Sequence, residues 1–320
     1  MSNTPDTMHD RFGDLRALLQ SHPGVRSDEH DAWTLQLCDL LKTLQELDPE
    51  RYEQECLPYL HDFAHLFAGY PLFHANSLNK LEAWIRRAPF ARFALSVHIR
   101  PYNPQLQKLA NSPALSSLHT LDFSRCLLGM DGLHMLSSSP HLAADLSVLD
   151  LSHTSMTPRL AIPFFEELTL QKLTSLALND NDLGDIGVAH VANTPLLESL
   201  THLCLNNNKV QTKGFIALAE SPHLTQLTSL QLAHNKIGST ALKAMIDSPV
   251  FSSLKTLDLS NNNLKDKGAK LLANAPSLTN LTTLRLHGND ISEEGARALA
   301  SSPYLHESIR RNMSLGSKME

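Results

Sequence analysis

The 320-residue sequence lacks the short motifs that mark many enzymes. It contains no GxGxxG or GxxxxGK[ST] loop for a nucleotide phosphate and no GxSxG turn for a serine nucleophile. No run approaches the roughly 18 apolar residues that a membrane-spanning helix needs, so we expect no membrane insertion. The N-terminal segment is polar and acidic, without the apolar core of a secretory signal.

Cysteine and positive charge are also scarce. The four cysteines stand far apart with no CxxC pair, which is typical of a reducing compartment, and we expect a cytoplasmic protein. Lys and Arg number 27 against 33 Asp and Glu, which gives a net charge of −6. Because there is neither a basic excess nor a basic stripe, nucleic-acid binding is disfavoured. The 42% of hydrophobic residues is enough for a folded core.

What the sequence does contain is an internal repeat. From residue 118 the pattern LxxLxLxxNxLxxxG returns seven times, each time followed by a helical stretch that usually ends near Ser-Pro. The leading leucines are separated by one step of 28 residues and then five steps of 27. They are Leu118, Leu146, Leu173, Leu200, Leu227, Leu254 and Leu281. A period held over this length predicts a stack of similar structural units.

Each position of the repeat has a structural reason. Leu176 and Leu178 alternate with polar residues, as in a short strand with one buried face. Five repeats then carry an asparagine, whose amide can satisfy backbone groups of the turn as both donor and acceptor. These structural asparagines are Asn181, Asn208, Asn235, Asn262 and Asn289. Glycines such as Gly214 and Gly268 indicate little room or an unusual backbone angle, and prolines such as Pro222 end the helix.

The motif resembles the leucine-rich repeat in its long, helix-containing form, as in the ribonuclease-inhibitor and Ran GTPase-activating protein families. The LAxSPxL endings at 218–224 and 299–305 are similar to those of bacterial leucine-rich-repeat proteins with a helical N-terminal region. The resemblance covers residues 118–305. It implies an α/β fold, a horseshoe-shaped solenoid with a parallel β-sheet on the concave side and helices on the convex side.

We divide the chain into four parts by this pattern. Residues 1–89 show no repeat, and we expect them to form a small α-helical N-terminal capping domain. A degenerate first repeat follows at 90–117, and seven repeats of 27–28 residues span 118–307. Residues 308–320 form a short C-terminal tail. The degenerate repeat rests on Phe90, Phe93 and Leu95, which stand one 28-residue step before the leucines of the next unit.

The two ends leave alternatives open. Residues 1–89 hold 14 acidic and 8 basic residues, and this acidic surface is either simply solvated or a docking face for a basic partner. The C-terminal tail either folds over the last repeat or leaves its edge free to pair with another chain. We expect a monomer, with an edge-to-edge dimer through the C-terminal repeat as the alternative.

A search for catalytic or metal-binding groups gives little. His61 and His65 have the i, i+4 spacing of a helical zinc site but no evident third ligand, so we predict no metal site. Asp122 and Asp150 fall on neighbouring strands, about 4.8 Å apart, and could hold a cation or a basic side chain. Cys204 is a reactive thiol only if a base lies nearby, and the sequence shows none. We therefore predict no catalytic residues, no cofactor and no enzyme.

The second repeat departs from the pattern. It has Leu160 in place of glycine, and Pro158 and Pro163 flank its expected helix start. Phe164 takes a buried leucine position, and Phe165 replaces a small residue. Two interpretations follow: a locally irregular helix with a bulkier core, or a protruding apolar spot on the convex side.

A binding surface remains as the candidate site. Polar side chains that alternate with the buried leucines must face outward from the concave sheet. The proposed partner-binding residues are Asp122, Arg125, Asp150, His153, Asp180, His202, Cys204, Gln231, His234, Asp258, Arg285 and His287. This face lacks the Trp and Tyr anchors of tight interfaces, so the sequence predicts a module for moderate protein–protein interaction, with a protein partner of unknown identity.

Two further functions stay open. One is a regulator of an enzyme, GTPase-activating or inhibitor-like, which rests on analogy of repeat type alone. The other is a secreted bacterial effector that uses the repeats for targeting.

Overall fold

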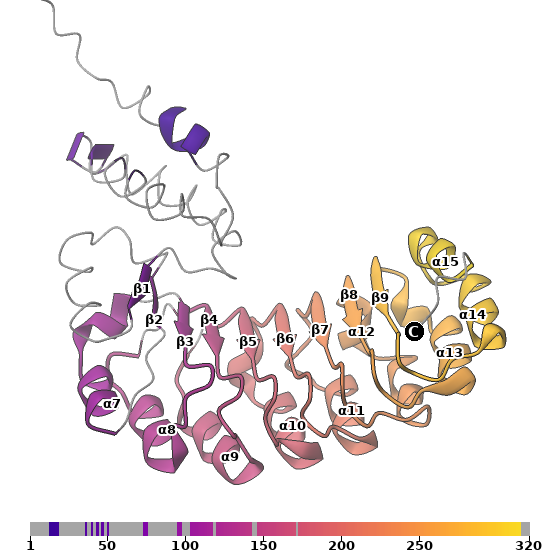
Figure 1. Cartoon of the computed structure of the whole chain (residues 1–320), viewed down its shortest axis with the longest axis horizontal. Helices are drawn as coiled ribbons and strands as arrows, with labels where there is room; N and C mark the ends of the chain where they lie inside the picture. The colour runs from indigo at the N-terminus through magenta and orange to yellow at the C-terminus, as the bar shows by residue number, and fades with distance from the viewer. Residues whose placement is uncertain are drawn as a thin grey trace, which may run out of the picture.

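The computed structural model shows a curved stack of strand–helix units, with the strands along the concave side and the helices along the convex side (Figure 1). The residues described are 13–18, isolated helical positions between 36 and 50, 73–75, 95–97, 103–117, 120–142, 146–170 and 172–314. The predicted α/β leucine-rich-repeat solenoid is confirmed over this part of the chain.

Seven short strands within the described residues form one parallel sheet in sequence order. They are β3 (Thr120–Asp122), β4 (Val148–Asp150), β5 (Ser175–Ala177), β6 (His202–Cys204), β7 (Ser229–Gln231), β8 (Thr256–Asp258) and β9 (Thr283–Arg285). Each strand pairs residue for residue with the next, so that Leu203 lies opposite Leu230. The central leucine of every strand is at most 8% exposed, because this face of the sheet carries the core.

Each repeat contributes at least one helical segment outside the sheet. The α-helices are α7 (Asn103–Ala110), α8 (Gly129–Ser137), α9 (Pro158–Glu167), α10 (Gly184–Ala192), α11 (Thr212–Ala219), α12 (Pro249–Ser253), α13 (Lys265–Ala273), α14 (Glu293–Ala300) and α15 (Glu307–Ser314). The 3-10 helices are η3 (Pro113–Ser117), η4 (Pro195–Leu197), η5 (Ala241–Met245) and η6 (Pro276–Leu278).

Close packing explains the helical glycines. A Cβ at Gly214 would lie 2.7 Å from Oδ1 of Asp185 and 2.9 Å from Cγ1 of Val210. At Gly268 it would lie 2.7 Å from Cβ of Leu264. Neither glycine has a positive φ. Of the two reasons that the sequence allowed, little room is therefore the correct one at these positions.

The asparagine column connects the repeats through hydrogen bonds. Nδ2 of Asn235 donates to the carbonyl oxygens of Leu205 and Leu232, both at 3.0 Å. Its Oδ1 accepts from the backbone N–H groups of Asn208 at 3.0 Å and Val210 at 2.9 Å. One buried amide thus satisfies backbone groups in its own turn and in that of the preceding repeat, which removes the cost of burying them unpaired.

The serine of the Ser-Pro ending makes a second link between repeats. Oγ of Ser248 donates to the carbonyl oxygen of Ala219, and Oγ of Ser302 to that of Ala273, each at 2.5 Å. Ser139 makes the same 2.5 Å bond to Ala110 at the end of α7. The proline ends each helix, and the serine before it fastens the chain to the end of the preceding helix.

The second repeat is more regular than expected. Helix α9 is continuous over its ten residues, with Pro158 at its start and Pro163 inside it. The first proline is tolerated because the first N–H groups of a helix have no partner within the helix. Phe164 and Phe165 are each 2% exposed, and their rings pack edge to face with centroids 5.2 Å apart. The bulkier core is therefore correct, and the protruding apolar spot at Phe165 is wrong because its ring fills the interior.

At the N-terminal end a small second sheet precedes the main one. Strand β1 (Phe73–Ala75) pairs in parallel with β2 (Leu95–Val97), and β2 lies beside β3 (Figure 1). Strand β1 falls inside the span expected to be helical, so that expectation was incomplete. Pairing between the two strands satisfies backbone groups that a helix would satisfy internally. Leu15 and Leu44 of this region are fully buried.

Several sequence expectations lie outside the described residues. They concern Phe90, Phe93, His61, His65 and Leu118.

The C-terminal tail folds onto the last repeat. Helix α15 packs against α14 and buries Ile309, while Met313 packs at the edge of the core. The amphipathic pattern of this helix covers apolar surface that another repeat would otherwise bury. None of the helices in the described ranges is both long and apolar enough to cross a bilayer.

We predict that Asn235→Ala lowers the free energy of unfolding by roughly 3 kcal/mol, because it leaves several buried backbone groups without partners. Urea denaturation followed by circular dichroism measures this. The matched control is Asn263→Ala, an exposed asparagine in the next repeat, one position after the asparagine column. It should change stability by less than about 0.5 kcal/mol. Equal losses in the two variants would contradict the role of the asparagine column.

Candidate functional site

The concave face ends in a row of residues with a left-handed backbone. This strand-end row consists of Arg125, His153, Asp180, Asn207, His234, Asn261 and Gly288, with φ between 53° and 68°. In every member except Gly288, which lies in the last repeat, the N–H donates to a carbonyl oxygen of the next repeat, as in the 2.8 Å bond from Arg125 to Ser152. Asn, Asp, His and Gly tolerate this backbone better than other residues, which explains their frequency here.

Side chains of the strand-end row bind one another across repeats. Nε2 of His153 lies 3.1 Å from Oδ2 of Asp180, and Nδ2 of Asn207 donates to Oδ1 of the same aspartate at 2.7 Å. Further along, Nδ2 of Asn261 lies 3.2 Å from Nε2 of His234. The structure thus brings two of the predicted site residues, His153 and Asp180, into direct contact.

Asp122 and Asp150 stand side by side, as the sequence predicts, but both are engaged with their own turns. They are paired in register on β3 and β4. Oδ1 of Asp122 accepts the N–H of Ser124 at 2.7 Å, and Oδ1 of Asp150 that of Ser152 at 2.8 Å. Burial raises the pKa of Asp150, and the charge of Asp122 adds to this effect, while the bonds from Ser152 oppose it. The aspartates therefore stabilise the ends of their strands.

The side chain of Asp258 is less accessible to a binding partner than the sequence predicts. It is only 8% exposed, and its Oδ1 accepts a hydrogen bond from the N–H of Ser260 at 2.9 Å. Its Oδ2 lies 3.6 Å from Nη1 of Arg285. The expectation that Asp258 faces outward to a partner is therefore corrected: Arg285 is the exposed member of this pair.

Cys204 lies between Ala177 and Gln231 in the register of the sheet. Burial raises the pKa of its thiol to about 11, and the charge of Asp150 contributes. The thiol therefore stays protonated at neutral pH, and the interpretation of Cys204 as a reactive nucleophile is not supported.

The remaining predicted residues form separate local contacts. Nδ1 of His202 lies 2.8 Å from Oγ1 of Thr201, and partial burial lowers the pKa of this histidine. Gln231 accepts a 3.1 Å bond from Nδ2 of Asn206, and Nδ1 of His287 lies 2.9 Å from Oγ of Ser260. Asn206, which is not among the predicted site residues, thus binds the predicted residue Gln231.

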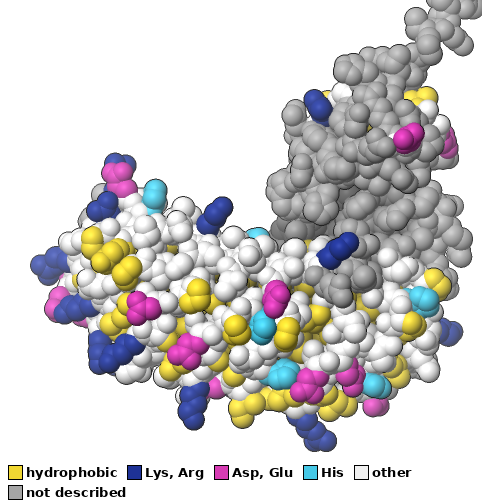
Figure 2. Space-filling model, turned by 180° about the vertical axis from the view of Figure 1, so that it is seen from behind, with side chains coloured by type: hydrophobic (Ala, Val, Ile, Leu, Met, Phe, Trp, Pro, Cys, Tyr) yellow, Lys and Arg dark blue, Asp and Glu magenta, His cyan; other side chains and the backbone are white. Residues whose placement is uncertain are grey.

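The face of the solenoid that is visible in Figure 2 carries charges of both signs. On the face seen in Figure 2, acidic, basic and histidine side chains are interspersed, with no broad area of one sign. Among the described residues no group of three or more His, Cys, Asp or Glu side chains is placed to hold a metal ion.

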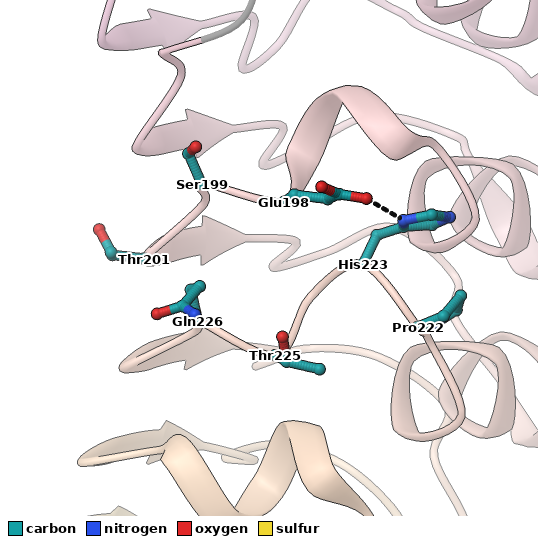
Figure 3. A pocket seen from close by; sticks show the side chains of 7 residues that line it. All are labelled: Glu198, Ser199, Thr201, Pro222, His223, Thr225 and Gln226. Atoms are coloured by element: carbon teal, nitrogen blue, oxygen red, sulfur yellow. Dashed lines mark hydrogen bonds and ion pairs between the residues drawn. The ribbon is translucent and has the colours of Figure 1, made fainter.

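A pocket that the sequence did not indicate lies between two repeats, beside the N-terminal ends of β6 and β7 (Figure 3). Its volume is about 620 Å³. It is lined by Glu198, Ser199, Thr201, Pro222, His223, Thr225 and Gln226. Nδ1 of His223 lies 2.9 Å from Oε1 of Glu198. Their one sequence signal is a place just after Pro195 or just at and after Pro222, the equivalent prolines of two successive repeats.

We predict that Cys204 resists alkylation. At pH 8 iodoacetamide should modify it roughly a hundredfold more slowly in the folded protein than in urea, because a pKa near 11 leaves little thiolate. Peptide mass spectrometry follows this residue separately from the other cysteines.

The matched variant is Asp150→Asn, which removes a nearby negative charge and should speed the modification of Cys204. Equal rates in folded and unfolded protein would contradict the assignment.

Three solved structures are similar to parts of this chain. A Bacteroides fragilis protein is 16% identical, over 64% of this chain and 70% of its own, with a TM-score of 0.43. A Listeria monocytogenes internalin is 21% identical, over 66% and 70%, with a TM-score of 0.36. Human trophoblast glycoprotein 5T4 is 23% identical, over 60% and 68%, with a TM-score of 0.42. Similarity at this level says nothing about activity or partners.

A family model matches the repeat units of the chain. A search of curated proteins finds no match. The family model described as "Leucine Rich repeat" matches residues 169–192, 223–245, 252–273 and 277–300. It does not distinguish the ribonuclease-inhibitor or Ran GTPase-activating type. The matched segments lie in the strand–turn–helix units described above, and these units are leucine-rich repeats.

Proposed function

We propose that the chain is a non-enzymatic interaction module that binds a protein partner on the concave face of its solenoid. The observation that carries the proposal is the network of side-chain bonds between repeats on this face, such as those among His153, Asp180 and Asn207. Side chains already held in place lose less conformational entropy when a partner binds, so a polar face of this kind is preorganised for recognition.

The chemistry of the face supports binding over catalysis. The carboxylates of Asp122 and Asp150 accept bonds from their own turns, and the Cys204 thiol is held protonated. An open sheet also lacks the enclosed, dry environment in which general acids and bases are effective.

The same face favours an exchangeable complex. Its exposed positions include Arg125, His202 and His287 but no tryptophan or tyrosine, the residues that most often anchor tight interfaces. We propose a monomeric protein, because α15 covers the core of the last repeat. We also propose a reducing, cytoplasmic location, because the four cysteines stand far apart in the sequence with no CxxC pair.

The test is a quantitative pull-down from a lysate of the source organism. The concave variant combines Arg125→Glu, His202→Glu and His287→Glu, all at exposed positions spread along the sheet. We expect it to reduce recovery of a protein enriched by the wild type by at least about tenfold, because it reverses or adds charge at three contact positions.

The control carries Lys213→Glu and Lys267→Glu on the convex helices, which changes the net charge by the same amount when histidine is neutral. It should retain the partner. Circular dichroism establishes that both variants fold. Loss of the partner in the convex variant alone, or in neither variant, would contradict binding on the concave face.

A further inference from the structure

The pocket between the third and fourth full repeats is a junction of equivalent segments. Glu198 and Ser199 in one repeat correspond to Thr225 and Gln226 in the next, each 27 residues further along the chain. Figure 3 shows Glu198 and His223 facing one another at one side, while Ser199 and Gln226 lie toward the strands. The pocket is thus formed where the repeat places different polar side chains at equivalent positions.

The charge of the pocket has one sign. Among the seven lining residues Glu198 is the one carboxylate, and there is no lysine or arginine. Its side chain is 67% exposed, whereas that of His223 is 21% exposed. Only Oε1 of the glutamate is in contact with the histidine, at 2.9 Å. A negatively charged group therefore faces the pocket with one oxygen directed to the histidine.

Most of the other polar atoms can accept hydrogen bonds. A bond to a carboxylate requires the proton of a neutral His223 on Nδ1, which leaves its Nε2 as an acceptor. Ser199, Thr225 and Gln226 add two hydroxyl oxygens and an amide oxygen. Thr201 is already committed, since its Oγ1 donates to the carbonyl oxygen of Thr174 at 3.0 Å.

We propose that this pocket binds an arginine or lysine side chain presented by the protein partner. An ammonium or guanidinium group has only donors and a positive charge, which complements one carboxylate among neutral acceptors. A phosphate group would find no lysine or arginine among the lining residues, and a sugar would find no tryptophan, tyrosine or phenylalanine ring to stack on. That the cation comes from a protein rests on the proposed function, but the chemistry of the pocket does not.

The pocket also extends the binding surface sideways. It lies beside the N-terminal ends of β6 and β7, whereas the strand-end row lies beyond the opposite ends of the strands. A partner on the concave face that also reaches this edge with one basic side chain would make contacts at both sides of the sheet. Such a contact fixes its position along the array, because the pair of Glu198 and His223 occurs at this junction and the next junction has Thr225 and Val250 at those positions.

The test uses Nα-acetyl-arginine amide as a probe, titrated into the full ¹⁵N-labelled chain at pH 7.5. We expect saturable shifts of the amide signals of Ser199, Thr225 and Gln226, with a Kd of about 1–10 mM, as suits one small cation. Glu198→Gln should weaken this binding at least about tenfold, because it removes the charge and keeps the shape. The uncharged Nα-acetyl-norleucine amide should produce no saturable shift.

The matched control is Glu167→Gln. Glu167 makes the same type of contact, 2.8 Å from Nδ1 of His134, but lies outside the pocket. This variant should bind the arginine probe within about twofold of the wild type.

Any of three results would overturn the proposal: no saturable shift up to about 50 mM probe, unchanged affinity in Glu198→Gln, or equal shifts with the norleucine compound. Shifts with inorganic phosphate or glucose in place of the arginine probe would also overturn it. Since the probe needs no partner, probe binding together with an unaffected concave variant would keep the pocket and reject the proposed function. The reverse pair of results would reject only the pocket.

Discussion

The buried turn after each strand sets the terms for the rest of the structure. Its backbone N–H and C=O groups lie in the core, away from water, and each one left unpaired would be costly. An asparagine such as Asn235 meets this need with one side chain, which bonds its own turn and that of the preceding repeat. Because these hydrogen bonds cross between repeats, they hold neighbouring turns at a fixed spacing. This spacing in turn sets the distance between strands, the alignment of the helices and the arrangement of the concave face.

Much of this could be predicted from the sequence, because the determinants are periodic. Alternating leucines fix the buried face of each strand, and the 27-residue step places equivalent residues side by side. Individual rotamers do not follow from a period. Whether the carboxylate of Asp258 faces a partner or bonds its own turn depends on a single side-chain rotation. Burial of Phe165 depends in the same way on the space that its neighbours leave.

The pocket and the first small sheet lay beyond prediction for a different reason. Glu198 and His223 stand in the irregular segments between helix and strand, where the consensus allows almost any residue. Their meeting depends on how two loops pack and not on a pattern within either loop. Strand β1 likewise forms because a parallel neighbour, β2, is available 22 residues later. Features that depend on a pair of irregular segments carry little signal in a single sequence.

The serine links have a mechanical consequence. Ser139, Ser248 and Ser302 each bind the C-terminal end of the helix in the preceding repeat, so these contacts join only adjacent repeats. A stack connected in this way carries tension through a series of similar links. Pulled apart from the α15 end, it would release one repeat at a time, each at a similar force, and lengthen in regular steps. Under such a load the outermost repeat would yield before its neighbours, because it is linked on one side only.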